Sequence, residues 1–401
     1  MLEMVLRLPA TYDQISEAHY WLSEISEHEE EKREHLELAL SHNPAHHLAK
    51  KKLAILEGKL NEAEIINPDN VPAQDTSKPI QSEGEGYFCH QCGGKLTYSP
   101  DGSQLICEYC QSQEQFPKDG KVNETEFVVG ISTIAGHKKA KTMQSFTCKA
   151  CGAVYLISPE VLSLTCPHCE STFSIKKTET SELIPPEGII PFVVSRDEVE
   201  HIIIRWLKNN QVNKIPFFES ITGIYLPVWT FDVNGLVKWT GQLSEEDSYY
   251  PTSGQKLFSF DDILIPACEQ QPHEFMEILA GFDSGNILAY SPKYTANWLA
   301  ESYTIMMSDA AIEAHSQAFM TAKRILRKKD ELREMINPFF SSAELFIEAF
   351  KLILVPVWIG TYMFTNTRYH LTINGMSGDI RGELPPTRLQ RFTNWLIKKK
   401  E

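Results

Sequence analysis

The chain has 401 residues and a formal net charge of −15; 42% of the residues are hydrophobic and 23% are charged. This composition is typical of a globular protein with two to four domains. The acidic excess disfavours unassisted wrapping of nucleic acid, because neutralising phosphates requires clustered lysines and arginines. The longest apolar run, residues 352–364, is too short to cross a bilayer and contains Pro356 and Gly360. We therefore expect a soluble, cytoplasmic protein.

Helices are expected in the N-terminal segment. Residues 10–60 carry an imperfect apolar stripe with a break at Asn43-Pro44, a pattern that resembles one and a half tetratricopeptide repeats within residues 1–66. The acidic run from Glu27 to Glu34 is interpreted as a solvated helix face, with a partner-docking surface as the alternative. Three histidines are interpreted as surface residues, since no carboxylate or cysteine completes a metal site around them: His42, His46 and His47.

Residues 67–86 combine proline, glycine and polar residues without an apolar period, which predicts a linker. Two short cysteine-rich units follow, at residues 87–116 and 146–177; we call them the first and second cysteine units. Residues 117–145, between them, include an apolar piece that predicts a connecting helix packed against both units: Phe127, Val128, Ile131 and Ile134.

Eight of the nine cysteines form two sets with one spacing, C-x2-C, fourteen residues, C-x2-C. A shift of 59 positions superimposes the two sets and also matches Pro100 with Pro159, which indicates an internal duplication. The remaining cysteine, Cys268, is expected to be a buried small hydrophobic residue. The first set is Cys89, Cys92, Cys107 and Cys110, and the second is Cys148, Cys151, Cys166 and Cys169.

This spacing is typical of structural zinc sites. Two C-x2-C turns supply four thiolates at about 2.3 Å from one tetrahedral ion and leave no position for a catalytic water. The sequence therefore predicts two structural Zn²⁺ ions in two zinc ribbons. Each ribbon is expected to contain a short antiparallel hairpin, residues 95–99 with 104–107 and residues 154–158 with 162–166. Disulfide pairing is the alternative, but it requires an oxidising compartment.

Residues 185–401 are expected to form a larger α+β domain with an antiparallel sheet, so that the chain as a whole is an α+β multidomain protein. Ser195 and Glu198 form a capping-box pattern, and a long helix is predicted over residues 308–335. Two dipeptides predict hairpin turns, Asn234-Gly235 and Asn374-Gly375. The similar segments at residues 226–229 (LPVW) and 355–358 (VPVW) indicate equivalent strands in two related halves. Aromatic residues here are interpreted as core, with an exposed ligand groove as the alternative: Tyr225, Trp229, Trp239, Trp298, Trp358 and Tyr362.

The paired cysteine units, together with residues 221–232, 282–303 and 351–386, resemble bacterial transcription-factor-IIB-type zinc-ribbon proteins. The resemblance covers nearly the whole chain, and the family is largely uncharacterised. Some of its members resemble a stress-operon protein that acts with a membrane partner to recruit phage-shock-type proteins. The resemblance thus implies a membrane-stress or regulatory assembly, although the helical N-terminus departs from those relatives.

A non-enzymatic adaptor that binds protein partners is the function we expect. Nucleic-acid binding is the alternative, because lysines such as Lys95 and Lys149 alternate with aromatic residues in the cysteine units. A basic helix over residues 387–400 is expected to pack through Trp395, with contact to an anionic membrane as the alternative. Catalysis is not expected, since no nucleophile elbow, phosphate loop or open metal site accompanies the candidate carboxylates Asp261, Asp262, Asp283 and Glu301. Asp232 is interpreted as part of the Asn234-Gly235 turn.

Overall fold

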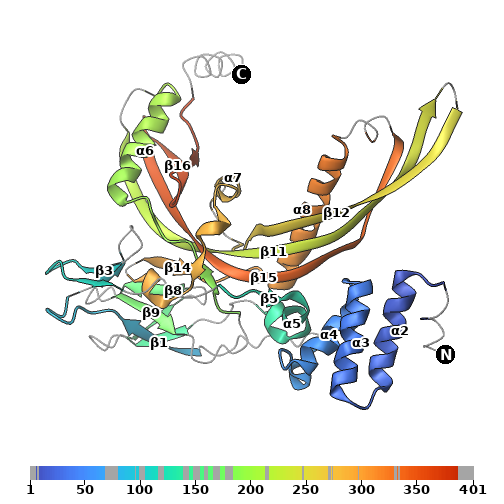
Figure 1. Cartoon of the computed structure of the whole chain (residues 1–401). Helices are drawn as coiled ribbons and strands as arrows, with labels where there is room; N and C mark the ends of the chain where they lie inside the picture. Colours follow the sequence, from blue (N-terminus) through green and yellow to red (C-terminus); the bar gives the residue numbers. More distant parts are fainter. Residues whose placement is uncertain are drawn as a thin grey trace.

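The computed structural model describes residues 6, 9–67, 80–94, 96–98, 104–115, 122–138, 144–147, 154–157, 161–165, 172–176, 184–212, 216–245, 248–269, 272, 274–296, 298–328, 332 and 335–386. Within them the molecule is a mixed α+β structure built around a long, strongly curved sheet (Figure 1). The N-terminal helices and the strands of the cysteine units lie apart from one another along this sheet. None of the described helices is both long and apolar enough to cross a bilayer.

Three helices form the N-terminal bundle, α2 (Tyr12–Ile25), α3 (Glu29–His42) and α4 (His47–Leu56), and the short η1 (Glu62–Glu64) follows. α2 begins with a capping box, in which the side chains of Thr11 and Gln14 each accept from the other residue's backbone N–H. The predicted break at Asn43-Pro44 is confirmed, because it separates α3 from α4. The bundle is held by the buried side chains of Tyr20, Leu36, Ala39 and Ala49.

The linker prediction is wrong for residues 80–86. β1 (Ile80–Gly86) pairs parallel with β6 (Gln144–Thr147) and antiparallel with β9 (Thr172–Lys176). Pairing uses backbone N–H and C=O groups, so a segment rich in glycine and glutamate can fill the space between two strands. Residues 68–79 lie outside the described part of the chain.

The first cysteine unit forms a three-stranded antiparallel sheet of β2 (Leu96–Tyr98), β3 (Gln104–Cys107) and β4 (Gln113–Gln115). β2 and β3 are the arms of the predicted hairpin, which is confirmed. β4 adds a strand that the sequence pattern does not predict.

In the second cysteine unit, the predicted hairpin is wrong within the described residues. β7 (Val154–Ile157) pairs with β6, and β8 (Val161–Thr165) pairs with β9. β6 precedes β7 in the chain and β9 follows β8, so each arm of the predicted hairpin pairs with a different neighbour. β8 also pairs with β14 (Leu299–Glu301), which ties this unit to the C-terminal residues.

A helix lies between the two units in sequence, and its main contacts among the described residues are with the N-terminal bundle and the C-terminal core. β5 (Thr125–Glu126) leads into α5 (Phe127–Ser132) and η3 (Ile134–His137). Phe127 and Ile131 join the core around α8 (Met307–Leu326), and β5 pairs with β15 (Ile336–Phe364). Phe127 and Ile131 are therefore partly buried against the C-terminal core.

Three strands, which we call the long sheet, belong to a larger sheet that has 14 strands within the described residues: β11 (Phe217–Glu245, 29 residues), β12 (Ser248–Pro266, 19 residues) and β15 (29 residues). β11 lies in the middle and is antiparallel to both neighbours. The turn predicted at Asn234-Gly235 is wrong, because both residues lie inside β11. Gly235 has a φ of +137°, and a Cβ there would lie 2.0 Å from the Glu344 carbonyl oxygen. This glycine therefore permits the close approach of β15 to β11 in a short stretch between two register shifts.

The LPVW and VPVW segments meet at a single residue pair in the long sheet. Leu226 pairs with Val355, and the antiparallel register places the two segments symmetrically about that pair. The flanking strands repeat this relation: β10 (Gly188–Ile189) pairs parallel with residues 353–354, and β14 pairs parallel with residues 224–225. The order of elements repeats as well, since α6 (Arg196–Asn209) stands between β10 and β11 as α8 does between β14 and β15.

Several further elements pack against the long sheet or extend it. α6 begins with the predicted capping box of Ser195 and Glu198, whereas α8 ends at Leu326 and is shorter than predicted. β16 (Thr367–Asn374) and β17 (Ile380–Gly382) form the hairpin predicted at Asn374-Gly375, but Asn374 is the last residue of β16 and residues 375–379 connect the strands, so the connection is longer than a two-residue turn. Residues 387–401 lie outside the described part. The short elements are α7 (Phe275–Leu279), η4 (Ser284–Asn286), β13 (Leu288–Ala289) and η5 (Pro292–Thr295).

Candidate metal centre

The first cysteine set stands on two tight turns at one end of the three-stranded sheet. In the first turn, Cys89 N–H donates to the Gly94 carbonyl (2.8 Å) and Gly93, at φ +70°, donates back to the Cys89 carbonyl (2.8 Å). In the second, Gln111 occupies the corresponding left-handed position at φ +60° and donates to the Cys107 carbonyl (3.1 Å). A non-glycine residue at such a φ stores strain, so the second turn is held by its surroundings.

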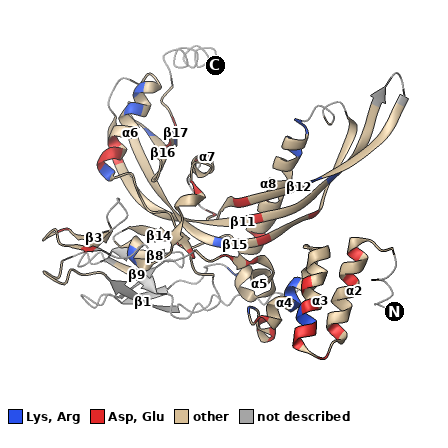
Figure 2. Cartoon of the chain, viewed as in Figure 1, with Lys and Arg blue, Asp and Glu red and all other residues tan. Residues whose placement is uncertain are grey.

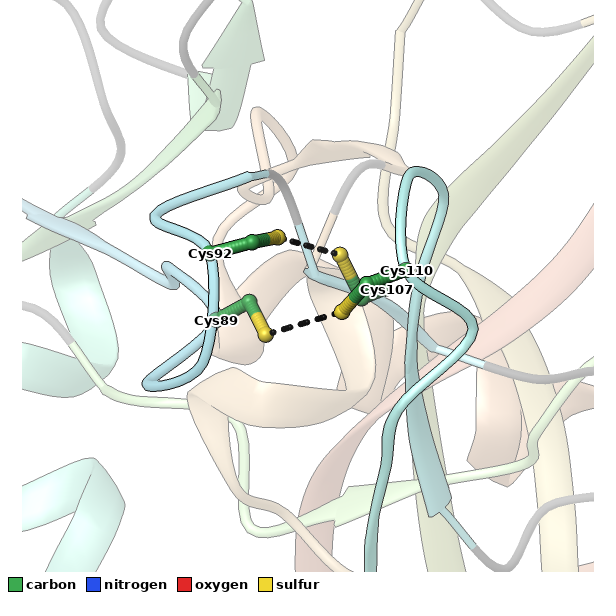
Figure 3. Close-up of side chains that lie close together, drawn as sticks. All are labelled: Cys89, Cys92, Cys107 and Cys110. Atoms are coloured by element: carbon green, nitrogen blue, oxygen red, sulfur yellow. Dashed lines mark hydrogen bonds between the residues drawn. The ribbon is translucent and has the colours of Figure 1, made fainter.

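The four sulfurs converge (Figure 3). The Sγ atoms of Cys89 and Cys110 are 3.6 Å apart, those of Cys92 and Cys107 are 3.5 Å apart, and all four lie within 4.8 Å of one another. Four thiolates at about 2.3 Å from a tetrahedral ion are separated by about 3.8 Å. The backbone N–H groups of Gln91 and Gly94 each point at a sulfur from 3.4 Å. The group can therefore hold one metal ion with four sulfur ligands.

Ser112 is a member of the site that the sequence reasoning missed. Its hydroxyl lies 2.9 Å from Cys89 Sγ and 3.2 Å from Cys110 Sγ. Hydrogen bonding with Ser112 is the main cause of a lowered pKa at two cysteines. The pKa of Cys110 is lowered to about 6, and the pKa of Cys89 is lowered as well. The only sequence signal was a hydroxyl residue two positions after the last cysteine.

Cys92 shows the opposite behaviour. Its bond from the Gly94 N–H lowers the pKa, but hydrogen bonds to Cys110 and Cys107 outweigh it and raise the pKa to about 12. Crowded thiols resist full ionisation, since each further thiolate adds a like charge. A divalent cation removes this conflict by binding all four sulfurs as thiolates.

The first cysteine unit is not a free-standing module. Cys89, Leu96 and Cys107 belong to the same buried cluster as Tyr225 and Trp358 of the long sheet. Tyr98 is fully buried, its ring lies edge-on to Tyr294 at 5.0 Å, and its N–H donates to the Ala296 carbonyl (3.3 Å). The metal centre is thus built into the C-terminal core on one side and exposed at Cys92 and Cys110 on the other.

The second cysteine set, Cys148, Cys151, Cys166 and Cys169, lies outside the described residues. Cys268 is buried, as predicted, and its Sγ lies 3.8 Å from the Glu301 carboxylate. Asp283 accepts from the Gly285 N–H at the start of η4, and Asp261 is exposed. His46 is buried rather than on the surface, because its Nδ1 accepts from the Ala49 N–H (3.2 Å) at the start of α4.

A second group of charged residues lies where β11, β12 and β15 bend. Asp232 accepts from the Asp262 N–H (3.0 Å), and Lys351 Nζ lies 2.7 Å from Asp262 and 2.6 Å from Glu124. Burial raises the pKa of Asp232 to about 7. The three carboxylates lie within ligand distance of one another, but the ammonium of Lys351 already supplies the positive charge. Asp232 therefore lies inside β11 beside the ion pairs of Lys351 and not in a hairpin turn.

The aromatic residues of the long sheet form its core. Tyr225, Trp229 and Tyr362 are completely buried, and Trp358 is nearly so. Trp298 stacks on Phe192 with ring centres 4.1 Å apart. The core interpretation is confirmed for these residues, while Trp239 is half-buried at the edge of the α8 core.

Comparison with known proteins supplies one relative and no activity. No family model matches the chain. The chain is 24% identical over 331 residues to the uncharacterized protein YdjG of Bacillus subtilis (strain 168), a match that covers 75% of this chain and 90% of the relative. No solved structure matches.

Proposed function

We propose that this chain is a non-enzymatic zinc-binding adaptor of the cytoplasm. In this proposal the first cysteine set holds one structural Zn²⁺ and the second set holds another, each within a transcription-factor-IIB-type ribbon. The N-terminal helices act as a tetratricopeptide-like surface. The convergence of four sulfurs around one centre carries the proposal, because a closed four-sulfur site gives a metal a structural role and leaves no position for substrate.

The exposed side of the metal centre is the proposed protein-binding surface. Tyr109, between the last two cysteines of the set, is 71% exposed, and its ring lies beside Gly94 of the first turn. Exposed tyrosines are frequent anchors of protein interfaces, because the ring buries a large area at small conformational cost. The net charge of −15 favours protein over nucleic acid as the partner.

Two measurements test this proposal. Elemental analysis of the purified chain should give two zinc ions per chain; a zinc-free, folded chain would contradict it. Affinity capture with nuclease treatment should then recover a protein partner with the wild-type chain. The control variant Tyr250→Ala, which alters an exposed tyrosine far from the metal centre, should recover it equally well. Tyr109→Ala should reduce recovery several-fold. Equal recovery with Tyr109→Ala and Tyr250→Ala would rule out the exposed side of the metal centre as the binding surface.

A further inference from the structure

A cavity of about 860 Å³ lies between the N-terminal bundle and the C-terminal unit. Residues from α3, α4, α5, α8 and β15 line it. Small-molecule sites usually measure about 300–1,000 Å³ and occur preferentially where two structural units meet. The metal centre shares no lining residue with the cavity, so the two sites can be tested independently.

The walls of this cavity are mostly apolar. Each of the surrounding helices contributes aliphatic or aromatic side chains, and Phe346 and Ile347 contribute from the edge of β15. An apolar space of this size is costly to leave to water, so an aliphatic chain is the ligand class that fits it. The helices supply Leu40, Leu53, Phe127, Val128, Ile131 and Ile312.

Of the five lysine and glutamate side chains in the walls, all but one have an ion-pair or hydrogen-bond partner within the described residues. Lys59 forms ion pairs with Glu57 (2.8 Å) and with Glu126. His315 Nε2 lies 3.1 Å from the Leu345 carbonyl oxygen, and Glu348 accepts from the Asn234 amide. Among the described residues, each glutamate that lines the cavity therefore already has an ion-pair or hydrogen-bond partner.

Lys50 is the exception. Its Nζ lies over the Phe346 ring, 4.4 Å from the centre, and within the described residues it forms no ion pair with a carboxylate. Burial lowers the pKa of Lys50, and the more distant charges of Glu348 and Glu126 only partly oppose this. Figure 2 shows the basic residues gathered on α4, the helix that carries Lys50 to the cavity. The half-buried ammonium of Lys50 thus lies beside the apolar cavity without an ion-pair partner among the described residues, and an anionic ligand can supply that partner.

We propose that this cavity binds a single-chain anionic amphiphile, with its aliphatic chain against α5 and α8 and its head group paired to Lys50. A carboxylate or a phosphate head group meets the same requirement, so a free fatty acid and a lysophospholipid are both possible sources. Because the ligand touches the N-terminal bundle and the C-terminal unit at once, its binding stabilises their contact.

Calorimetric titration of the metal-loaded full chain, below the micellar concentration, tests the proposal with three probes of equal chain length. Oleate and oleoyl lysophosphatidate carry the two candidate head groups, and oleyl alcohol has none. We expect saturable binding of at least one anionic probe. Lys50→Met, which keeps the aliphatic stem, should weaken that binding about tenfold and change oleyl alcohol affinity less than about twofold.

Two further variants complete the test. Lys51→Met removes a neighbouring charge outside the cavity lining and should leave all affinities unchanged. Val128→Trp fills the cavity and should abolish binding of all three probes, with thermal melting used to verify that the variant is folded. Absence of binding to the wild type, or equal loss of affinity in the Lys50 and Lys51 variants, overturns the proposal. The stronger of the two anionic probes identifies the head group.

Discussion

The first cysteine unit and the long sheet are stabilised by opposite means. The unit has three strands of three or four residues, and the positions of its four sulfurs follow from turns within short segments of chain. The long sheet joins two strands of 29 residues that lie far apart in sequence, and its core is built from large aromatic side chains. Local spacing determines the first structure, and long-range register determines the second. Changes in the two regions should therefore have different consequences.

The largest effect is expected from Cys107→Ser in the first cysteine unit. Loss of one buried ligand removes a contribution that amounts to about 10 kcal/mol or more in small zinc peptides. The metal content should fall by one ion per chain, and amide hydrogen exchange should rise in β2, β3 and β4. Cys268→Ser provides the control, because Cys268 is buried but lies outside the sulfur group. An unchanged metal content in the Cys107 variant would show that the four sulfurs do not act together.

The second effect concerns the bend of the long sheet. The side chains of Lys351 and Asp262 are only 6% and 10% exposed, so Lys351→Met leaves a buried carboxylate without its counter-charge. We expect a loss of about 3–5 kcal/mol in the free energy of unfolding, measured in urea. Lys238→Met removes the exposed pair with Glu344 and should cost less than about 1 kcal/mol. Comparable losses in the two variants would mean that the bend does not depend on its buried pair.

The smallest effect is a dependence of stability on pH near the same bend. Burial raises the pKa of Glu187 to about 7, against the hydrogen bond from Thr125. Between about pH 4.5 and 7 the folded chain binds this proton more tightly than the unfolded chain, so the free energy of unfolding falls as pH rises, by at most about 3 kcal/mol.

Glu187→Gln should flatten this part of the pH profile, measured by urea unfolding at pH 5.5 and 8. Part of the slope should remain, because burial also raises the pKa of Asp232 to about 7. Glu200→Gln, an exposed change on α6, should reproduce the wild-type profile. A wild-type stability that rises over this range would contradict the assignment.

The same contrast explains what the sequence could predict. The sulfur group, the capping box at Ser195 and the break at Asn43-Pro44 each depend on residues close in sequence, and all three are found in the structure. The network of Asp232, Asp262, Glu124 and Lys351 was not predictable, because its members come from four separate strands and loops.

Asn234-Gly235 shows how a local rule fails in a long-range setting. The dipeptide favours a two-residue hairpin turn because glycine adopts positive φ at little cost. The structure uses that same freedom of Gly235, but for the close approach of β15 to β11 between two register shifts. The dipeptide indicates an unusual backbone conformation, and the pairing with β15 determines whether that conformation lies in a turn or within a strand.

The pairing of β11 with β15 also bears on how the chain is made. β11 is complete at Glu245, yet its partner begins only at Ile336. Ribosomes add about 5–20 residues per second. One edge of the long, aromatic-rich β11 therefore stays unpaired for several seconds before β15 has been synthesised. During that interval β12 can protect the other edge, and the exposed edge is where nascent chains of this protein should depend most on chaperones.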